Sequence, residues 1–501
     1  MENSEAFAEA STTSIGVTTT SPSKSNSYFA TLAGGSRVPT KQRRSGARKA
    51  RAGMGAATTC QFYSSEAGCR FGNRCRALHV GAPTKPVRLD PRELMVSEDA
   101  ALRRFVADRC IDPVRFEAML EQLTPSPLET AERRRVLDSI RVAFKPFLVR
   151  ALAEARRDIR PASAAPQTIG LQLFGSTFSG LWMPSSAGEW AALSDMDLAL
   201  VASDEARRRA QRWWASEVPA SSSSSSSSAA APRVAATVSA VHDLTTCAWS
   251  NRWWARLHRA AHKAGAMDVV LIASATMPVL KLRWPLGAAM EERSIAIDVT
   301  LGNCDAVAKT AFVRAIVRCD DRIAPLIRVV KCWAQQHGAQ SADPSDGLNS
   351  FALTLLIFHW MQRCEPRPML PPLRPLFAAL AEEPELPLDA AMGELGVAPS
   401  HCKGSVAELL HRFVRYYATV CPATRGGGSA VPYVLRLLDV DRDGEQFEWP
   451  GDRVWALGIE DPITVGVNPA RSCHDMTLLR FTRALHVSVG VWDDAAKPPP
   501  L

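Results

Sequence analysis

Apolar residues recur at helical spacing in two parts of the chain and at strand spacing between them. The helical period is found in residues 88–165 and again in residues 306–490, where Pro-rich stretches separate the helices. The intervening residues 166–305 instead contain short apolar runs typical of strands, Asp197–Val201 and Ser294–Val299. The pattern predicts an α+β protein with a small α/β unit between a helical lead-in, which we expect to pack on the central domain, and a larger helical part.

Three other stretches lack a sustained apolar period. Residues 1–56 are rich in Ser, Thr, Ala and Gly, which predicts a disordered arm. Residues 217–235 contain the unbroken serine run Ser221–Ser228 and are predicted to form a loop insertion in the α/β unit, and residues 491–501 to form a tail. No stretch reaches the roughly 18 apolar residues that a membrane helix needs.

Positive charge is concentrated near the N-terminus. Residues 1–82 hold 11 Lys and Arg against four Glu, so they carry nearly all of the net charge of +8 of the 501 residues. Such an arm favours contact with RNA phosphates. Its basic runs, Lys41–Arg44 and Arg48–Arg51, also fit a nuclear signal, so a nuclear and a cytoplasmic location both stay open. Twelve cysteines without a signal peptide indicate a reducing compartment rather than secretion.

Residues 57–83 contain four candidate zinc ligands within a short segment. Three thiolates and one imidazole with the spacing C-x8-C-x5-C-x3-H satisfy a tetrahedral Zn²⁺ ion, and so short a segment has no core without one. The predicted ligands are Cys60, Cys69, Cys75 and His79. The spacing resembles that of the CCCH zinc fingers of RNA-binding proteins.

In that family, aromatic side chains stack between the unpaired bases of single-stranded RNA. The matching aromatic residues and the neighbouring cations are Tyr63, Phe71, Arg70, Arg74 and Arg76. Ala77 stands where strong binders often have a further aromatic residue. A purely structural or protein-binding zinc knot is the alternative interpretation.

Three carboxylates of the α/β unit form a second candidate metal site. Asp195 and Asp197 lie two residues apart at the head of an apolar run, so strand alternation places both on one face, and Asp298 lies on another predicted strand. Converging carboxylates suit Mg²⁺ or Mn²⁺, which can activate a hydroxyl and neutralise a transferring phosphoryl group. Upstream, the Gly175–Ser176 turn offers amides and a hydroxyl to a triphosphate. Taken alone, the Asp195 and Asp197 pair also fits a solvated strand end.

The order of these motifs resembles the DNA-polymerase-β-like nucleotidyltransferase superfamily, and within it the noncanonical poly(A) and poly(U) polymerases, which are terminal RNA nucleotidyltransferases. Further matching segments are Thr276–Leu282, Leu326–Trp333, Asp346–Leu353 and Ile459–Pro462. The resemblance implies a catalytic unit with a mixed sheet, residues 166–305, packed against a largely helical poly(A)-polymerase-associated domain, residues 306–490. It also implies transfer of nucleotides from an NTP to RNA 3′ ends.

The resemblance further implies roles for individual residues. Asp195 and Asp197 would hold both metal ions, and Asp298 would help to deprotonate the RNA 3′-hydroxyl. Residues at nucleotide-binding positions of the family are Gly175, Ser176, Asn303, Lys331, Ser350, Phe351, Asp461 and Val467.

The triphosphate and the ribose account for four of these positions. Ser176, Lys331 and Ser350 match residues that hold the triphosphate, and Asn303 matches one that contacts the ribose. A second lysine of the family is Gln335 here, which removes one charge from the triphosphate grip. Ser350 has a simpler alternative role as a helix cap.

The base would be contacted by the remaining residues. Phe351 stands where a Tyr usually stacks, although it also fits a core position, and Asp461 matches an acidic residue near the base edge. Val467 replaces a His that favours uracil, and Thr464 replaces an acidic residue that supports that His. ATP is therefore expected to be favoured over UTP. A uridylyltransferase of the same family and a catalytically inert RNA-binding adaptor are the alternatives.

Overall fold

Two parallel strands form the centre of a five-stranded mixed sheet. In this computed structural model the strand order is β1–β2–β5–β4–β3, and within that sheet only β2 and β5 run parallel. The strands are β1 (Ile169–Phe174), β2 (Met196–Ala202), β3 (Met267–Ile272), β4 (Val279–Pro285) and β5 (Ser294–Leu301). The α+β class and the mixed sheet expected from the sequence are confirmed.

The chain divides into two units, residues 1–17 with 97–501 and residues 18–96. The structure describes parts of the first unit only, namely residues 99–158, 169–184, 194–202, 249–273, 277–286, 294–336, 338–340, 347–383, 386–420, 434–438, 455–464 and 466–496. The predicted basic arm, zinc finger and serine insertion lie outside these described residues.

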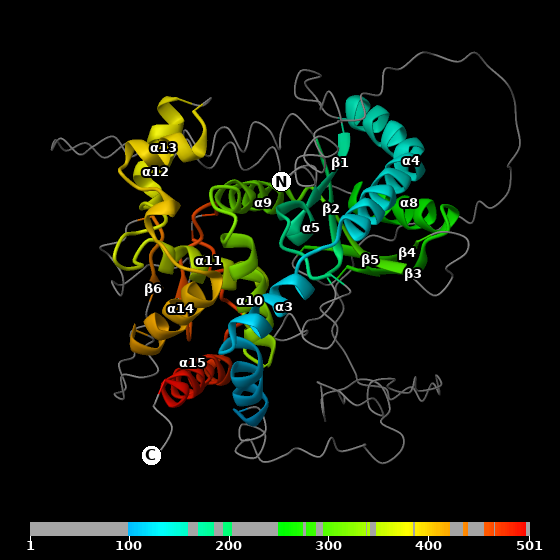
Figure 1. Cartoon of the computed structure of the whole chain (residues 1–501). Helices are drawn as coiled ribbons and strands as arrows, with labels where there is room; N and C mark the ends of the chain where they lie inside the picture. The colour runs from blue at the N-terminus through cyan, green and yellow to red at the C-terminus, as the bar shows by residue number, and fades with distance from the viewer. Residues whose placement is uncertain are drawn as a thin grey trace, which may run out of the picture. The chain divides into compact units, whose positions relative to one another are not determined.

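Different helices cover the two faces of the sheet (Figure 1). On one face, Leu198 and Val299 belong to an apolar cluster with helices α4 (Pro127–Asp158) and α8 (Trp249–Lys263). On the other, Ala199 and Val201 contact Cys304 at the start of α9 (Cys304–Val317). The period of two along β2 thus separates an apolar layer from the layer that carries the acidic residues.

A helical unit follows the sheet and has its own core. Its elements are α10 (Ile323–Gln336), α11 (Ser350–Met361), α12 (Leu373–Glu382), α13 (Leu388–Glu394), the 3₁₀ turn η5 (Pro399–His401), α14 (Val406–Val420), the short parallel strands β6 (Val434–Leu435) and β7 (Gly458–Ile459), and α15 (Asp475–Ala495). The apolar α11 lies at the centre of this core, where every residue from Ala352 to Met361 is buried. Among the described helices none is both long enough and apolar enough to span a bilayer.

The lead-in segment, residues 88–165, divides between two cores. The π-helix η2 (Val106–Cys110) and helix α3 (Pro113–Gln122) pack in the core of the helical unit, as predicted for the whole segment. Helix α4 packs instead on the sheet, because Ile140 and Phe144 lie on the helix face that meets the strands. The lead-in therefore contacts both the sheet and the helical unit.

The C-terminal tail expected at residues 491–501 begins as part of a helix. α15 continues to Ala495, and Val491 and Trp492 pack against the helical core. The apolar surface that these two residues bury explains why the helix extends beyond the predicted boundary.

A buried hydrogen bond joins two helices of this core and allows a test of its energetics. The indole N–H of Trp333 on α10 donates to Ser488 Oγ on α15 at 2.9 Å. In Ser488→Ala the buried indole N–H has no acceptor, so we expect the free energy of unfolding to fall by about 1–3 kcal/mol in denaturant titrations. The loss should shrink in a Trp333→Phe background, and an equal loss in both backgrounds would contradict the assignment.

Candidate active site

Three carboxylates converge where β2 and β5 pair. The parallel register sets Asp197 of β2 opposite Asp298 of β5. Asp195 precedes the first residue of β2, so it lies just before the strand rather than on it. One oxygen from each of the three side chains lies within 4.8 Å of the others. The sequence-predicted cluster is thus brought together, through a loop residue and two strand residues.

The electrostatics of this cluster favour a bound cation. Burial raises the pKa of Asp197 to about 8, with further contributions from the charges of Asp195 and Asp298. The pKa of Asp195 is also raised, first by burial and then by Asp298. An all-oxygen donor set of this kind fits Mg²⁺ or Mn²⁺, whose charge would offset both the desolvation and the repulsion.

Lys281 supplies positive charge beside the cluster and was not identified from the sequence. It lies opposite Asp298 in the antiparallel β4–β5 pairing, and its Nζ donates to Asp298 Oδ2 at 2.6 Å. Burial lowers the pKa of Lys281, but the hydrogen bond and charge of Asp298 outweigh it and raise the pKa overall. Only the strand register reveals this partner, because the two residues are 17 positions apart.

The Gly175–Ser176 turn packs directly against Asp197. Gly175 begins the short helix α5 (Gly175–Ser179) with φ of +69°, and a Cβ built there would lie 2.0 Å from Asp197 Oδ2. Its amide donates to Thr310 Oγ1 on α9 at 2.9 Å. Glycine is therefore needed here both for backbone conformation and for space.

Arg133 of α4 holds the segment that carries the acidic residues. Its Nη1 donates to Thr177 Oγ1 at 2.9 Å, and its Nη2 donates to the Ser194 carbonyl at 2.5 Å. The guanidinium lies 4.1 Å from the ring centre of Trp182, and burial lowers its pKa to about 10. Sequence reasoning missed this residue because its partners are 44 and 61 positions away.

Cations of the helical unit bind carbonyls that follow the turn. Arg314 donates to the Phe178 carbonyl at 2.6 Å, and Arg328 to the carbonyl of Gly180 at 2.8 Å. Lys331 Nζ reaches the next carbonyl, that of Leu181, at 3.4 Å. These contacts fix the segment that follows β1 against α9 and α10.

A cavity of about 700 Å³ lies between the sheet and the helical unit. Its lining includes most of the sequence-predicted nucleotide and metal residues, namely Gly175, Ser176, Asp195, Asp197, Lys331, Ser350 and Phe351. Burial lowers the pKa of Lys331 to about 8, with a further effect of Arg328. A triphosphate in this cavity would restore a counter-charge to that lysine.

Two residues of the cavity wall differ from expectation in detail. Ser350 is not the cap of α11, because the side chain of Asn349 accepts from the Ala352 amide at 2.8 Å; Ser350 Oγ instead accepts from Gln340 Nε2 at 3.0 Å. Gln335, where a lysine was expected, does line the cavity.

The remaining predicted residues, Asp298, Asn303, Asp461 and Val467, do not line the cavity. Asp461 reaches the cavity through Lys309, which the sequence did not single out: Lys309 Nζ lies 2.5 Å from Asp461 Oδ2, in an ion pair outside hydrogen-bond geometry, and 5.4 Å from the Phe351 ring centre. Asn303 caps α9 by accepting from the Ala306 amide. Val467 lies in a turn, where its amide donates to the Thr464 carbonyl, and neither it nor Asn303 lines the cavity.

Part of the chain is similar in sequence to known poly(A) polymerases. No protein-family model matches the chain. The Speckle targeted PIP5K1A-regulated poly(A) polymerase of Ailuropoda melanoleuca is 27% identical over 217 residues, which cover 41% of this chain and 23% of that protein. Poly(A) RNA polymerase GLD2 of Mus musculus is 25% identical over 224 residues, 44% of this chain and 42% of that protein. The chain is related in sequence to poly(A) polymerases.

The chain spans less than half of the length of these curated relatives. Among solved structures, the Cid1 poly(U) polymerase bound to MgATP is 19% identical, with a TM-score of 0.49 over 77% of this chain and 95% of that one.

Two glycines of the turn provide a matched test of its packing. Gly175→Ala should weaken Mn²⁺ binding at least about tenfold in calorimetric titrations, because its Cβ would displace the Asp197 carboxylate. Gly180 also has positive φ, at 76°, but a Cβ there meets nothing within 4 Å. Gly180→Ala should therefore incur only the backbone strain of about 1 kcal/mol, with Mn²⁺ affinity kept. Equal affinities in the two variants would show that the contact with Asp197 is unimportant.

Proposed function

We propose that the protein is a template-independent RNA 3′-terminal nucleotidyltransferase. The observation that carries this proposal is the presence of the Asp195 and Asp197 carboxylates and the Lys331 cation in one cavity. Carboxylates suit divalent metal ions, and a buried lysine suits a triphosphate. The sequence relation to curated poly(A) polymerases supports the same reaction.

In this reaction the RNA 3′-oxygen attacks the α-phosphorus of an NTP and pyrophosphate leaves. Metal ions held by Asp195, Asp197 and Asp298 would supply neutralisation of the charge that develops on the phosphoryl group. Asp298 is assigned to accept the proton of the attacking hydroxyl, and Lys281 holds its carboxylate in position. Gly175 has no Cβ and so leaves the Asp197 carboxylate in its position at the site.

The triphosphate is assigned to the part of the cavity lined by Lys331, Ser176 and Ser350. Lys331 would bind the phosphates as a cation, and Ser176 and Ser350 would donate hydrogen bonds from the two units. Because Gln335 replaces a second lysine of the family, that position adds no charge to the triphosphate contacts, and the lysines that line the cavity are Lys331 and Lys309. An NTP bound in this way would contact both the sheet and the helical unit beside the carboxylates.

The N-terminal segment is assigned to RNA. A zinc finger formed by Cys60, Cys69, Cys75 and His79 would bind single-stranded RNA by stacking and by charge, and the basic arm would lengthen its residence. These residues lie outside the described part of the chain, so the assignment rests on their spacing and composition.

An inert adaptor with the same fold is the competing proposal. A chain released from catalysis has no need of three converging carboxylates, of a glycine fitted against one of them, or of Lys281 beside another. The site contains all three features, which favours the enzyme.

The direct test incubates the protein and Mg²⁺ with a labelled RNA primer and each NTP separately. Asp197→Ala should lower the rate of primer extension by about a thousandfold or more, because a lost metal ligand removes several kcal/mol of transition-state stabilisation. RNA affinity should stay near that of the wild type. Asp321→Ala, which removes an exposed carboxylate elsewhere, should extend normally. Extension by Asp197→Ala at the wild-type rate would refute the site.

Nucleotide choice is the finer part of the proposal. With Val467 in place of a His, the enzyme lacks that donor for a uracil carbonyl, and an unpaired polar base edge costs about 1–3 kcal/mol. We expect kcat/KM to be higher for ATP than for UTP on one primer, and Val467→His to shift the ratio toward UTP. Thr464 offers that His no acidic support, so the shift should be small. A wild-type preference for UTP would instead support the uridylyltransferase alternative.

A further inference from the structure

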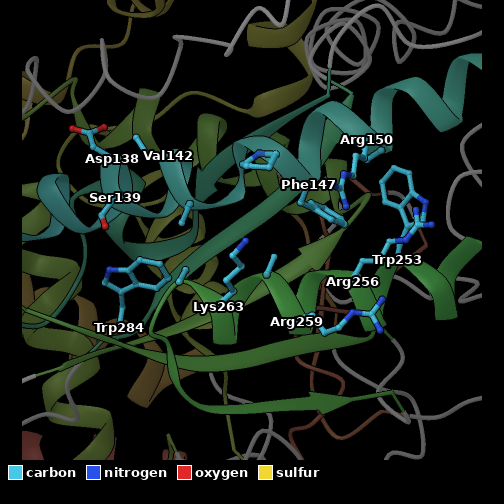
Figure 2. A pocket seen from close by; sticks show the side chains of 15 residues that line it. Asp138, Ser139, Val142, Phe147, Arg150, Trp253, Arg256, Arg259, Lys263 and Trp284 are labelled. Atoms are coloured by element: carbon cyan, nitrogen blue, oxygen red, sulfur yellow. The ribbon is translucent and has the colours of Figure 1, made fainter. Parts of the chain in front are cut away.

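A second cavity, of about 830 Å³, lies on the sheet face that packs against α4 and α8, which is opposite to the face of the carboxylates. It is lined by α4, α8 and Trp284 of β4 (Figure 2), and it shares no lining residue with the cavity that holds Asp195 and Asp197. The proposed reaction makes no use of it.

The sequence of the two helices leaves this space open. Pro146 lies inside α4 and has no amide hydrogen, so the Val142 carbonyl cannot receive its usual helical hydrogen bond. Both residues line the cavity, and Val142 is 73% exposed. Where the helices face each other, the lining consists largely of alanines, namely Ala143, Ala151, Ala260 and Ala264. Their short side chains do not fill the gap.

The inner wall of the cavity is aromatic. Phe147, Trp253 and Trp284 are each less than 10% exposed and belong to the core beneath the helices. Phe147 and Trp253 meet edge to face, with ring centres 5.8 Å apart. These rings line the cavity, and the small part of their surface that the core does not cover is apolar surface that a flat group can contact.

The rim of the cavity is basic. Figure 2 shows Arg150, Arg256 and Arg259 near one end, with Asp138 at the other. Arg256 pairs with Glu154, and Asp138 lies 3.6 Å from Arg141. Among the side chains that the structure describes, the ion pairs of this cavity involve Arg256 and Arg141, and none involves Arg150, Arg259 or Lys263. These cations have charge available for an anionic ligand.

We propose that this cavity binds single-stranded RNA, with bases against the aromatic wall and phosphates on the Arg150, Arg259 and Lys263 cations. Base stacking together with a cationic groove is the usual chemistry of single-strand binding, whereas an acidic peptide would leave the aromatic wall unused. The choice of RNA as the ligand rests on the proposed function.

Helix α4 connects this cavity to the reaction site. Arg133 near its start holds the Ser194 carbonyl beside Asp195, and Pro146 lies thirteen residues further along. At 1.5 Å per residue that distance is about 20 Å, so the cavity can hold a part of the RNA several nucleotides upstream of the 3′ end. Primers too short to reach it should not benefit from it.

The experiment measures binding of fluorescent single-stranded RNA to the full chain by anisotropy, without NTP. For an RNA of about 20 nucleotides, Arg150→Glu/Arg259→Glu should raise Kd about tenfold or more and reduce the slope of log Kd against log salt by about 1.4, the value for two lost phosphate contacts. Arg103→Glu/Arg104→Glu, an equal charge change at exposed positions outside the cavity, is the matched control and should match the wild type to within about twofold.

A second readout locates the RNA directly. RNA carrying 4-thiouridine should crosslink to peptides of α4 or α8 in the wild type and lose these crosslinks in Arg150→Glu/Arg259→Glu. If that variant does not fold, as judged by circular dichroism, Lys263→Glu replaces it. An unchanged Kd and salt slope relative to the control would overturn the proposal, as would crosslinks confined to other segments.

Primer length separates this proposal from the proposed function. Extension of a primer of about four nucleotides should be the same in the wild type and in Arg150→Glu/Arg259→Glu, because α4 spans about 20 Å between the two sites. A wild-type protein that extends no primer would refute the nucleotidyltransferase, while the binding and crosslinking measurements would still decide the use of the cavity.

Discussion

The parallel pairing of β2 with β5 is the constraint on which the site depends. It sets Asp197 and Asp298 side by side, and burial together with mutual repulsion raises the pKa of Asp197 to about 8. Two neighbouring residues accommodate these carboxylates, one by leaving space and one by supplying charge. Gly175 leaves space against one carboxylate, and Lys281 balances the charge of the other. A site built in this way is incomplete without a cation, which is the property that metal-assisted phosphoryl transfer requires.

The position of the helical unit depends on the same turn. After Ser176 the chain presents successive carbonyls, and these accept hydrogen bonds from Arg314, Arg328 and Lys331. Two of these cations, Arg328 and Lys331, are buried, and burial lowers the pKa of both. Of the three cations only Lys331 lines the cavity of the proposed nucleotide site, so this lysine takes part both in the contact between the sheet and the helical unit and in the proposed triphosphate site.

The sequence predicted what is encoded locally. The acidic motif and the Gly-Ser turn follow from short patterns, because strand alternation and a glycine turn act over a few residues, whereas the mixed sheet was expected from the family resemblance. Arg133 and Lys281 were missed because their partners become neighbours only through helix packing and strand register. The same reason explains why α4 was expected on the helical unit: its apolar period shows that one face is buried, but not against which element.

Base selection illustrates this limit further. The sequence ties the choice of nucleotide to Val467, whereas the structure places Lys309 Nζ 5.4 Å from the centre of the Phe351 ring. Asp461 Oδ1 accepts hydrogen bonds from the amides of Ile463 and Thr464, whereas Oδ2 faces Lys309 Nζ in an ion pair without a hydrogen bond. Oδ2 therefore keeps acceptor capacity for a ligand group, but the charge of Lys309 lies beside it. In the proposed reaction the choice of base would then depend on this ion pair, whose Asp461 side is buried and whose Lys309 side is 20% exposed, and a ligand that enters the cavity can reach it from the Lys309 side.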